Sequence, residues 1–167
     1  MSDKVKVEVS EAIRLMCQTS LGVLDKGFLC QSLSVLQSKA PLCVEQGATL
    51  DSVLDLLRTK KAGCAIIVDT SGKIVGIFSE RDFILKVAKD FEKLRSKPVD
   101  EYMTKNPETQ PPDSTIAYAL NLMSQGGFRH IPIVDPDLRP IGMVSVKDVV
   151  DYLVASFTAD LMNFPID

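Results

Sequence analysis

Residues 76–82, Gly-Ile-Phe-Ser-Glu-Arg-Asp, return at residues 142–148 as Gly-Met-Val-Ser-Val-Lys-Asp. The offset is 66 residues (142 − 76), and it holds without a gap across the surrounding segment. Outside the motif it pairs Pro41 with Pro107, Thr49 with Thr115, and Ile67 with Ile133. A repeat at a fixed period indicates one supersecondary unit built twice, and such units normally bury their exposed faces against each other. The sequence therefore directs the search for function to the seam between the two copies.

The composition describes an ordinary globular protein with enough apolar residues for a core. Of the 167 residues, 46% are hydrophobic and 25% are charged. The net charge of −3 and the pI near 5.2 argue against nucleic-acid binding, which usually needs a basic face. No apolar run approaches the roughly 18 residues that span a bilayer, and the N-terminal residues lack a signal-peptide core. The cytoplasm is the expected location.

The four cysteines, Cys17, Cys30, Cys43 and Cys64, all precede residue 65 and contain no CxxC pair. In a chain of this length without a signal sequence, this pattern favours buried or free thiols over a disulfide framework. A zinc site would need clustered ligands, and the only histidine is His130. We therefore expect no metal site.

Each copy predicts the element order β-α-β-β-α, which gives an α/β (α+β) fold class. After a short extended piece, a threonine suited to cap a helix (Thr49 or Thr115) precedes apolar residues at helical spacing. Glycine-containing segments are expected to end that helix. Two strands joined by a polar turn should follow, at residues 64–68 and 73–78 in the first copy, and 131–134 and 141–144 in the second.

The last helix of each copy is expected to begin at Ser79 or Ser145 and to run to about Phe91 or Phe157. These elements predict four segments: an N-terminal extension at 1–32, a first repeat at 33–91, a linker at 92–98 and a second repeat at 99–160. The linker is basic, and we expect it to be solvated. In the extension, one helical stripe predicts a helix that covers the core or a subunit interface; its members are Val9, Ile13, Met16, Cys17 and Leu21.

Together these features resemble a tandem pair of cystathionine-β-synthase (CBS) domains, also called a Bateman module, over about residues 33–157. The resemblance rests on the doubled unit, the Gly-x-x-Ser-x-x-Asp signature in both copies, and the segments 102–107 and 129–135, Tyr-Met-Thr-Lys-Asn-Pro and Arg-His-Ile-Pro-Ile-Val-Asp. It implies two repeats related by a pseudo-twofold axis, with ligands bound between them. The first copy departs from the pattern where Gly63-Cys64-Ala65-Ile66 replaces Arg129-His130-Ile131-Pro132.

The pairs Ser79/Asp82 and Ser145/Asp148 have the spacing of a capping box, in which serine and acid satisfy free amides at a helix start. This structural role leaves room for a second one, because a helix N-terminus can also bind an anion. In proteins of the family, the aspartate holds ribose and the serine or threonine lies near phosphate.

Carried over by position, the resemblance implies two clefts. One would combine Ser79 and Asp82 with Arg129, His130 and Lys147. The other would combine Ser145 and Asp148 with Arg81 and the small segment Gly63-Cys64. Because Arg81 and Lys147 sit at helix starts, where the dipole repels cations, a bound phosphate would offset that repulsion. The first cleft has more cationic side chains and is the one we expect to be occupied.

The resemblance implies a non-catalytic regulatory sensor that binds AMP, ADP, ATP or S-adenosylmethionine, requires no cofactor, and transmits binding to a partner protein. An alternative is a dimerisation or interaction module with empty clefts. An enzyme is the least favoured class, because no nucleophile and base are paired in the sequence. A homodimer is expected through the helices that begin at Ser79 and Ser145, whose apolar residues are Val87, Val149, Val150, Leu153 and Val154.

Overall fold

The computed structural model describes residues 26–36 and 40–162, with side chains described for 27–36 and 40–155. The stripe predicted at 9–21 lies outside these residues, so its helix stays a prediction. The chain divides into two compact units. We call residues 40–111 and 131–143 the sheet unit, and residues 26–36, 112–130 and 144–162 the helical unit. Among the helices described, none combines the length and apolarity that crossing a bilayer requires.

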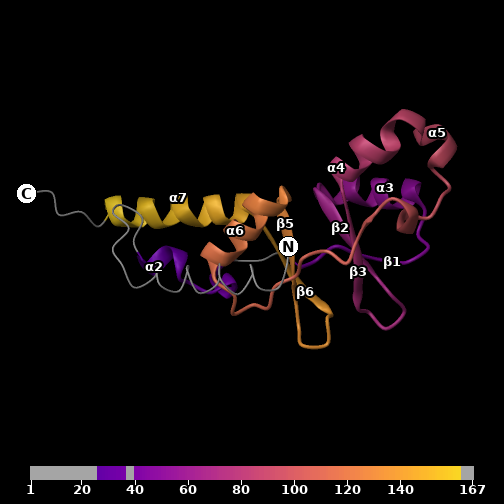
Figure 1. Cartoon of the computed structure of the whole chain (residues 1–167). Helices are drawn as coiled ribbons and strands as arrows, with labels where there is room; N and C mark the ends of the chain where they lie inside the picture. The colour runs from indigo at the N-terminus through magenta and orange to yellow at the C-terminus, as the bar shows by residue number, and fades with distance from the viewer. Residues whose placement is uncertain (1–25, 37–39, 163–167) are drawn as a thin grey trace, which may run out of the picture. The chain divides into compact units, whose positions relative to one another are not determined.

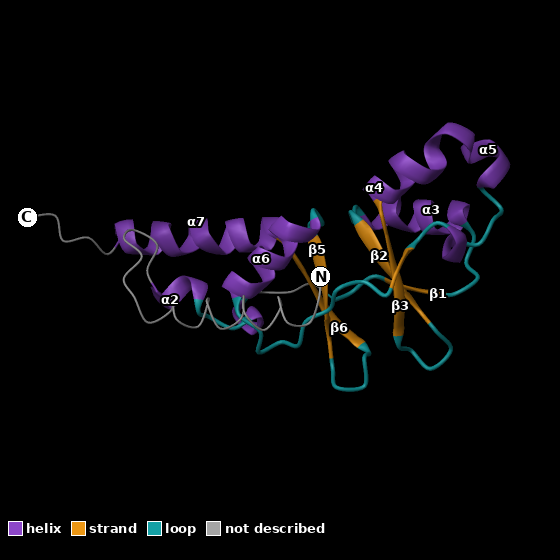
Figure 2. Ribbon diagram, in the orientation of Figure 1, coloured by secondary structure: helices purple, strands orange, loops and turns teal. Residues whose placement is uncertain are grey.

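The sheet unit is built on a four-stranded sheet with the order β1-β2-β3-β4. Figures 1 and 2 label its strands β1, β2 and β3. Its strands are β1 (Cys43–Glu45), β2 (Cys64–Val68), β3 (Ile74–Ser79) and β4 (Thr104–Lys105). β1 and β2 are parallel, so the chain must cross over between them, and α3 (Leu50–Lys60) makes that crossover. β3 is antiparallel to both β2 and β4. The segment 102–107, predicted to open the second repeat, thus contributes β4 to this sheet.

Helix α3 begins where the sequence predicts, because Thr49 accepts a hydrogen bond from the amide of Ser52. Its first two amides donate to carbonyls of the linker, Leu50 to Lys97 at 2.9 Å and Asp51 to Arg95 at 3.0 Å. The Arg95 guanidinium also lies 2.8 Å from the Asp51 carboxylate. This part of the linker is therefore bound to α3, and the expectation of a merely solvated segment is wrong for Arg95.

The core of the sheet unit lies between α3 and the sheet. It contains Leu50, Val53, Leu57, Ala65, Ile67, Phe78, Val87, Val99 and Met103. Full burial of one such large side chain contributes about 1.5–3 kcal/mol. Met103 also explains why the first signature has glycine at position 76. A Cβ built there would lie 2.2 Å from the Met103 sulfur, which is too close.

The segment after Ser79 is not the single helix that the sequence predicts. It consists of α4 (Glu80–Asp82), a π-helical turn η2 (Phe83–Val87), a 3₁₀ turn η3 (Ala88–Asp90) and α5 (Phe91–Leu94). In the π turn, the amide of Ala88 donates to the carbonyl of Phe83, five residues back. Val87 is only 1% exposed and belongs to the core, so its expected place on a dimer surface is wrong. Ile84 and Leu85 are the exposed apolar residues instead, at 67% and 70%.

The helical unit contains α2 (Lys26–Leu29), η1 (Leu33–Val35), α6 (Ile116–Gly126) and α7 (Val146–Met162). Thr115 caps α6 as predicted, accepting from the amide of Tyr118, and Gly127 ends it in the left-handed region at φ 66°. The segment before the first repeat packs on α7, because the Phe28 and Tyr152 rings stack at 5.6 Å and the Tyr152 hydroxyl hydrogen-bonds to Gln31. Val149 on α7 is buried, so it too was wrongly assigned to a dimer surface.

The second copy repeats the strand pattern of the first. β5 (His130–Val134) and β6 (Pro140–Ser145) form a two-stranded sheet, and η4 (Val99–Glu101) precedes β4. The parallel bridge of Gln110 with Ile133 reproduces the pairing of Val44 with Ile67, 66 residues earlier. The order β-α-β-β-α and the α+β class are therefore confirmed, whereas the symmetry relating the copies stays a prediction.

The cysteines do not all follow the sequence prediction. Cys43 and Cys64 are free thiols, but Cys30 is disulfide-bonded. The expectation of free or buried thiols without a disulfide is therefore wrong for Cys30. Neither the length of the chain nor the cysteine spacing indicated this bond.

Candidate functional site

The signature Ser79-x-x-Asp82 forms the capping box predicted from the sequence. Asp82 Oδ2 accepts the Ser79 amide at 3.0 Å and the Ser79 hydroxyl at 2.6 Å. In return, the Ser79 hydroxyl accepts the amide of Asp82 at 3.3 Å. These bonds fix the carboxylate at the point where β3 ends and α4 begins.

The other oxygen of Asp82 is also held by the protein. Lys86 Nζ lies 2.7 Å from Oδ1, and the Thr104 hydroxyl donates to the same oxygen at 3.1 Å. Lys86 makes a second contact, donating to the carbonyl of Tyr102 at 2.9 Å. Asp82 is only 9% exposed. Burial raises the pKa of Asp82, but the hydrogen bonds from Lys86 and Ser79 outweigh it, and the net pKa is lowered.

The second signature, Ser145-x-x-Asp148, builds the same box at the start of α7. Asp148 Oδ2 accepts the Ser145 amide at 2.7 Å and the Ser145 hydroxyl at 2.6 Å, and the Ser145 hydroxyl accepts the Asp148 amide at 3.2 Å. Asp148 is half-buried. Among the residues that the structure describes, none donates a hydrogen bond to Asp148 Oδ1, in contrast to Asp82. The predicted capping role is confirmed for both copies.

Each signature lies beside the segment that precedes the buried strand of its own copy. The amide of Glu80 donates to the carbonyl of Gly63 at 3.0 Å, and the amide of Val146 donates to that of Arg129 at 3.1 Å. The two bonds are equivalent by the 66-residue offset. Gly63 and Cys64 thus lie beside Ser79 in the sheet unit, and Arg129 and His130 lie beside Ser145 in the helical unit. The pairing of segments from different copies in one cleft stays a prediction.

The cationic residues of the site are on the surface. Arg81, Arg129 and Lys147 are exposed, and His130 is half-buried. Lys147 pairs with Asp151 one turn further along α7, with both side chains mostly exposed. An exposed pair of this kind contributes little stability, on the order of 0.5 kcal/mol, so Lys147 could exchange its partner for an anion at small cost.

The thiol nearest the first signature is unsuited to chemistry. Burial, followed by the charges of Glu80 and Asp82, raises the pKa of Cys64 to about 12. At neutral pH Cys64 is therefore protonated and a poor nucleophile. Within residues 26–36 and 40–162, no three His, Cys, Asp or Glu side chains gather as a metal site would require.

Two residues of the first site were missed at the sequence level. Lys86 stands four residues after Asp82, a spacing at which oppositely charged helix residues meet, so this contact had a readable signal. Thr104 had none, because it reaches Asp82 only through the pairing of β4 with β3.

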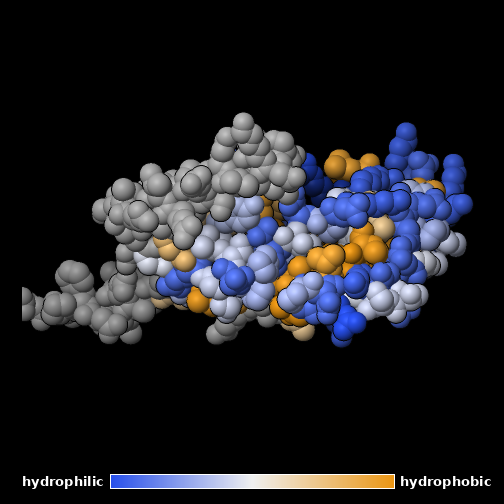
Figure 3. All heavy atoms as spheres, turned by 60° about the horizontal axis from the view of Figure 1, so that its bottom comes forward, coloured by the Kyte–Doolittle hydropathy of each residue, from blue (hydrophilic) through white to orange (hydrophobic). Residues whose placement is uncertain are grey.

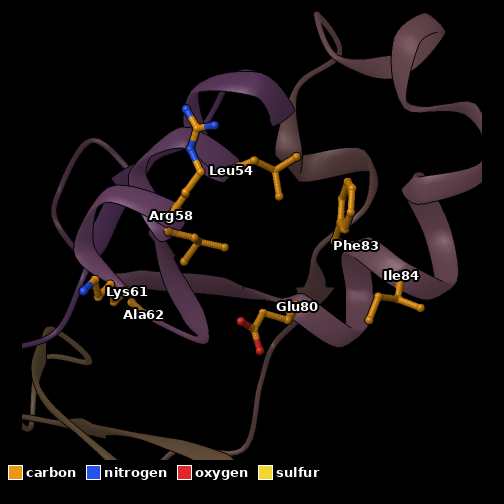
Figure 4. Close-up of a pocket in the computed structure, with 8 residues that line it drawn as sticks. Leu54, Arg58, Lys61, Ala62, Glu80, Phe83 and Ile84 are labelled. Atoms are coloured by element: carbon orange, nitrogen blue, oxygen red, sulfur yellow. The ribbon is translucent and has the colours of Figure 1, made fainter.

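A separate hollow of about 750 Å³ lies between α3 and the residues of α4 and η2. Figure 4 shows Leu54, Arg58, Lys61 and Ala62 on one wall, facing Glu80, Phe83 and Ile84 on the other. The lining is mostly apolar with charges at its edge. All of these residues belong to the sheet unit.

Comparison with known proteins gives a consistent result. The family model of the CBS domain matches residues 34–89 and 99–155. An uncharacterised 17.7 kDa protein of Acidianus ambivalens is 31% identical over 111 residues, which are 66% of this chain and 66% of that protein. The crystal structure of a CBS-domain containing protein from Agrobacterium tumefaciens is 27% identical, covers 73% of this chain and 98% of its own, and superposes with a TM-score of 0.68.

A further solved structure that resembles this chain is a complex with two ligands. The CBS domain pair of protein MJ0100, in complex with 5′-methylthioadenosine and S-adenosyl-L-methionine, is 25% identical to this chain. It covers 73% of this chain and 98% of its own, with a TM-score of 0.64.

Proposed function

Because the chain belongs to the CBS domain family through both of its repeats, we propose that it is a non-catalytic sensor of an adenosyl ligand. The candidate ligands are AMP, ADP, ATP and S-adenosylmethionine, and no cofactor is required. Ligand binding would be transmitted to a regulated partner protein, in the cytoplasm. A related CBS domain pair crystallised with two adenosyl compounds supports this choice of ligand class.

The observation that carries the proposal is the geometry of the two signature carboxylates. In each copy a capping box holds the aspartate at the start of a helix through one oxygen, Oδ2. The other oxygen, Oδ1, has two lone-pair sites that can accept both hydroxyls of a ribose, and at Asp82 Lys86 and Thr104 would have to yield them. At the start of α7, a helix of 17 residues, backbone amides and the positive end of the dipole favour a neighbouring phosphate.

We assign the contacts in two sets, as the resemblance implies. The first set is Ser79, Asp82, Arg129, His130 and Lys147. The second is Gly63, Cys64, Arg81, Ser145 and Asp148. In each set the aspartate would hold the ribose, the serine would lie near the phosphate, and the cations would neutralise phosphate or a carboxylate. In the second set the small residues Gly63 and Cys64 would leave space for the base.

The proposal excludes catalysis on chemical grounds. The carboxylates are engaged in caps, and the Cys64 thiol is protonated at neutral pH because its pKa is raised to about 12. The alternative class is an interaction module without a ligand. It would require that neither carboxylate bind ribose, so ligand binding separates the two classes directly.

We also propose that the protein is a homodimer that uses the exposed apolar residues of its last helical segments. Ile84 and Leu85 in the first copy, and Val150 and Val154 in the second, are about half exposed or more. Figure 3 shows apolar residues, in orange, interrupting a largely hydrophilic surface. Ile84 also lines the hollow of Figure 4, which a second copy could fill with an apolar side chain.

Equilibrium dialysis against AMP, ADP, ATP and S-adenosylmethionine tests the proposal. We expect at least one of them to bind with a Kd below about 1 mM, which corresponds to about −4 kcal/mol. The double variant Asp82→Asn/Asp148→Asn keeps the size of both side chains and should bind none of them. Guanosine nucleotides keep the ribose and serve to test base selectivity. If the wild-type protein binds no adenosyl compound, the interaction-module alternative replaces the sensor.

A further inference from the structure

The two signature carboxylates differ in how many of their acceptor sites the protein already uses. An ionised carboxylate offers about four lone-pair sites, two on each oxygen. At Asp82 all four are taken: Oδ2 by the amide and hydroxyl of Ser79, and Oδ1 by Lys86 and Thr104. A ribose could reach this carboxylate only by displacing two protein donors from Oδ1.

Asp148 has the same two bonds on Oδ2, both from Ser145. Its Oδ1 accepts from none of the residues that the structure describes. The two sites on that oxygen are the number that the two hydroxyls of a ribose need. Asp148 is also half-buried, whereas Asp82 is 9% exposed.

The difference originates at one position of the repeat. Lys86 and Tyr152 are equivalent by the 66-residue offset, each four residues after its aspartate. Lys86 turns back to Asp82 at 2.7 Å. The Tyr152 side chain has no positive charge; its ring stacks on Phe28 and its hydroxyl donates a hydrogen bond to Gln31. At this repeat position the first copy therefore has Lys86, the counter-ion of its aspartate. The second copy has Tyr152, which packs against the segment of Phe28 and Gln31.

The Lys86 contact is more than a single exposed ion pair. The same ammonium group donates to the Tyr102 carbonyl at 2.9 Å, so releasing it from Asp82 disturbs two partners. The oxygen it covers is further occupied by Thr104, which β4 holds beside β3. An incoming ribose would have to compete with a charged donor that the chain holds four residues after Asp82.

We infer that the two repeats are unequal: Lys86 acts as an internal ligand that closes Asp82, and Asp148 is the carboxylate that receives the ribose. This rests on the proposed function, and it reverses the order that the number of cationic side chains favours. It makes Lys86 the residue that sets how many ligands one chain holds.

Isothermal titration calorimetry with AMP tests this inference. We expect wild-type protein to bind about one AMP per chain, and Asp148→Asn to weaken binding at least about tenfold, or 1.4 kcal/mol. Asp82→Asn should weaken it less than about threefold. Lys86→Tyr, which places the residue of the second copy in the first, combined with Thr104→Val frees both sites on Oδ1 and should add a second AMP per chain. The control Lys89→Met removes an exposed cation from the same segment and should change nothing.

A reciprocal pair of variants at Tyr152 separates the effect of an added cation from the effect of lost packing. Tyr152→Lys places an ammonium group four residues after Asp148 and should weaken AMP binding, whereas Tyr152→Met loses the same Phe28 and Gln31 contacts without a cation and should not. Thermal melts verify that each variant is folded. The inference fails, and the proposed function survives, if Asp82→Asn abolishes binding while Asp148→Asn does not, or if Lys86→Tyr/Thr104→Val leaves the stoichiometry unchanged. Absence of binding of AMP, ATP and S-adenosylmethionine by every variant overturns both.

Discussion

The ammonium group of Lys86 lies 2.7 Å from the Oδ1 atom of Asp82, one helical turn away. This contact ties the first signature aspartate to a π-helical turn that the second copy lacks, since α7 is one continuous helix. A bond between a cation and a largely buried carboxylate has measurable consequences even without a ligand.

The first prediction concerns the titration of Asp82. Burial alone would raise the pKa of this carboxyl, and the hydrogen bond from Lys86 is the largest influence that lowers it. Lys86→Met removes the ammonium group but keeps an apolar stem, so the pKa of Asp82 should rise. Carbon-detected NMR of the carboxyl group during an acid titration measures this directly. Lys89→Met should leave the titration where it is, and an unchanged curve in Lys86→Met would show that the contact is absent in solution.

The second prediction follows from the same lowered pKa. A carboxyl whose folded-state pKa lies below its ordinary value of 3.8 stabilises the fold at pH values above 3.8. That stabilisation is lost as the pH falls through the folded-state pKa. Urea unfolding of the wild-type protein and Asp82→Asn should therefore differ at pH 7 and converge as the pH falls below 3.8. The control is Asp113→Asn, which removes the charge of an exposed residue in a turn. A difference that stays constant with pH would contradict the assignment.

The third prediction concerns the glycine of the first signature. Gly76→Ala would place a Cβ 2.2 Å from the sulfur and 2.9 Å from Cγ of Met103. Met103 is buried, so its side chain cannot simply turn into solvent. We expect a loss of about 1–3 kcal/mol in the free energy of unfolding, the usual cost of overpacking a core. In a Met103→Ala background the same change should cost much less, and equal costs in both backgrounds would disprove the clash.

The fourth prediction uses the equivalent turns of the two copies. Gly72 and Leu138 share a repeat position, and both are in the left-handed region, at φ 81° and 63°. A residue with a Cβ pays about 1–2 kcal/mol in this conformation, and glycine does not. Leu138 is 51% exposed, so little packing is lost on its removal.

Leu138→Gly should therefore raise the free energy of unfolding by about 0.5–1 kcal/mol after the entropy cost of glycine is subtracted. Gly72→Leu should lower it, because no atom lies within 4 Å of a Cβ there and only backbone strain remains. Chemical denaturation measures both variants. A stabilising Gly72→Leu would show that the turn is free to change its conformation.

The fifth prediction concerns assembly. Ile84→Glu introduces a charge at a residue that is 67% exposed and lines the apolar hollow. If this surface is the dimer interface, light scattering at tens of micromolar should show a dimer for the wild-type protein and a monomer for Ile84→Glu. Ile141→Glu changes an apolar residue of β6 that is 50% exposed and should leave the dimer intact. A monomeric wild-type protein would refute the proposal.

Much of the fold could be predicted because its determinants are local and occur twice. Thr49 and Thr115 cap their helices through bonds to residues three positions away, and the serine–aspartate boxes use the same short spacing. The parallel pairing of Val44 with Ile67 and of Gln110 with Ile133 follows from the offset once one copy is understood.

The remaining features depend on contacts that no local pattern encodes. The π turn at Phe83–Val87 moves Val87 into the core, although an ideal helical stripe places it on the surface. Thr104 reaches Asp82 from a strand 22 residues further along the chain. The disulfide of Cys30 joins residues by proximity in space, which spacing alone does not reveal. The spacing of Lys86 from Asp82 could therefore indicate part of the difference between Asp82 and Asp148, whereas the Thr104 contact could not be predicted.

The capping of α3 by the linker carbonyls of Lys97 and Arg95 has a consequence for how the protein is made. During synthesis the start of this helix leaves the ribosome well before the residues that satisfy its first amides, and β4 follows later still. The first repeat therefore cannot close from its own segment, and must wait for the chain that leads into the second. A fragment that stops at Phe91 should emerge as an incomplete fold, with the first two amides of α3 unpaired and an uncovered edge on β3.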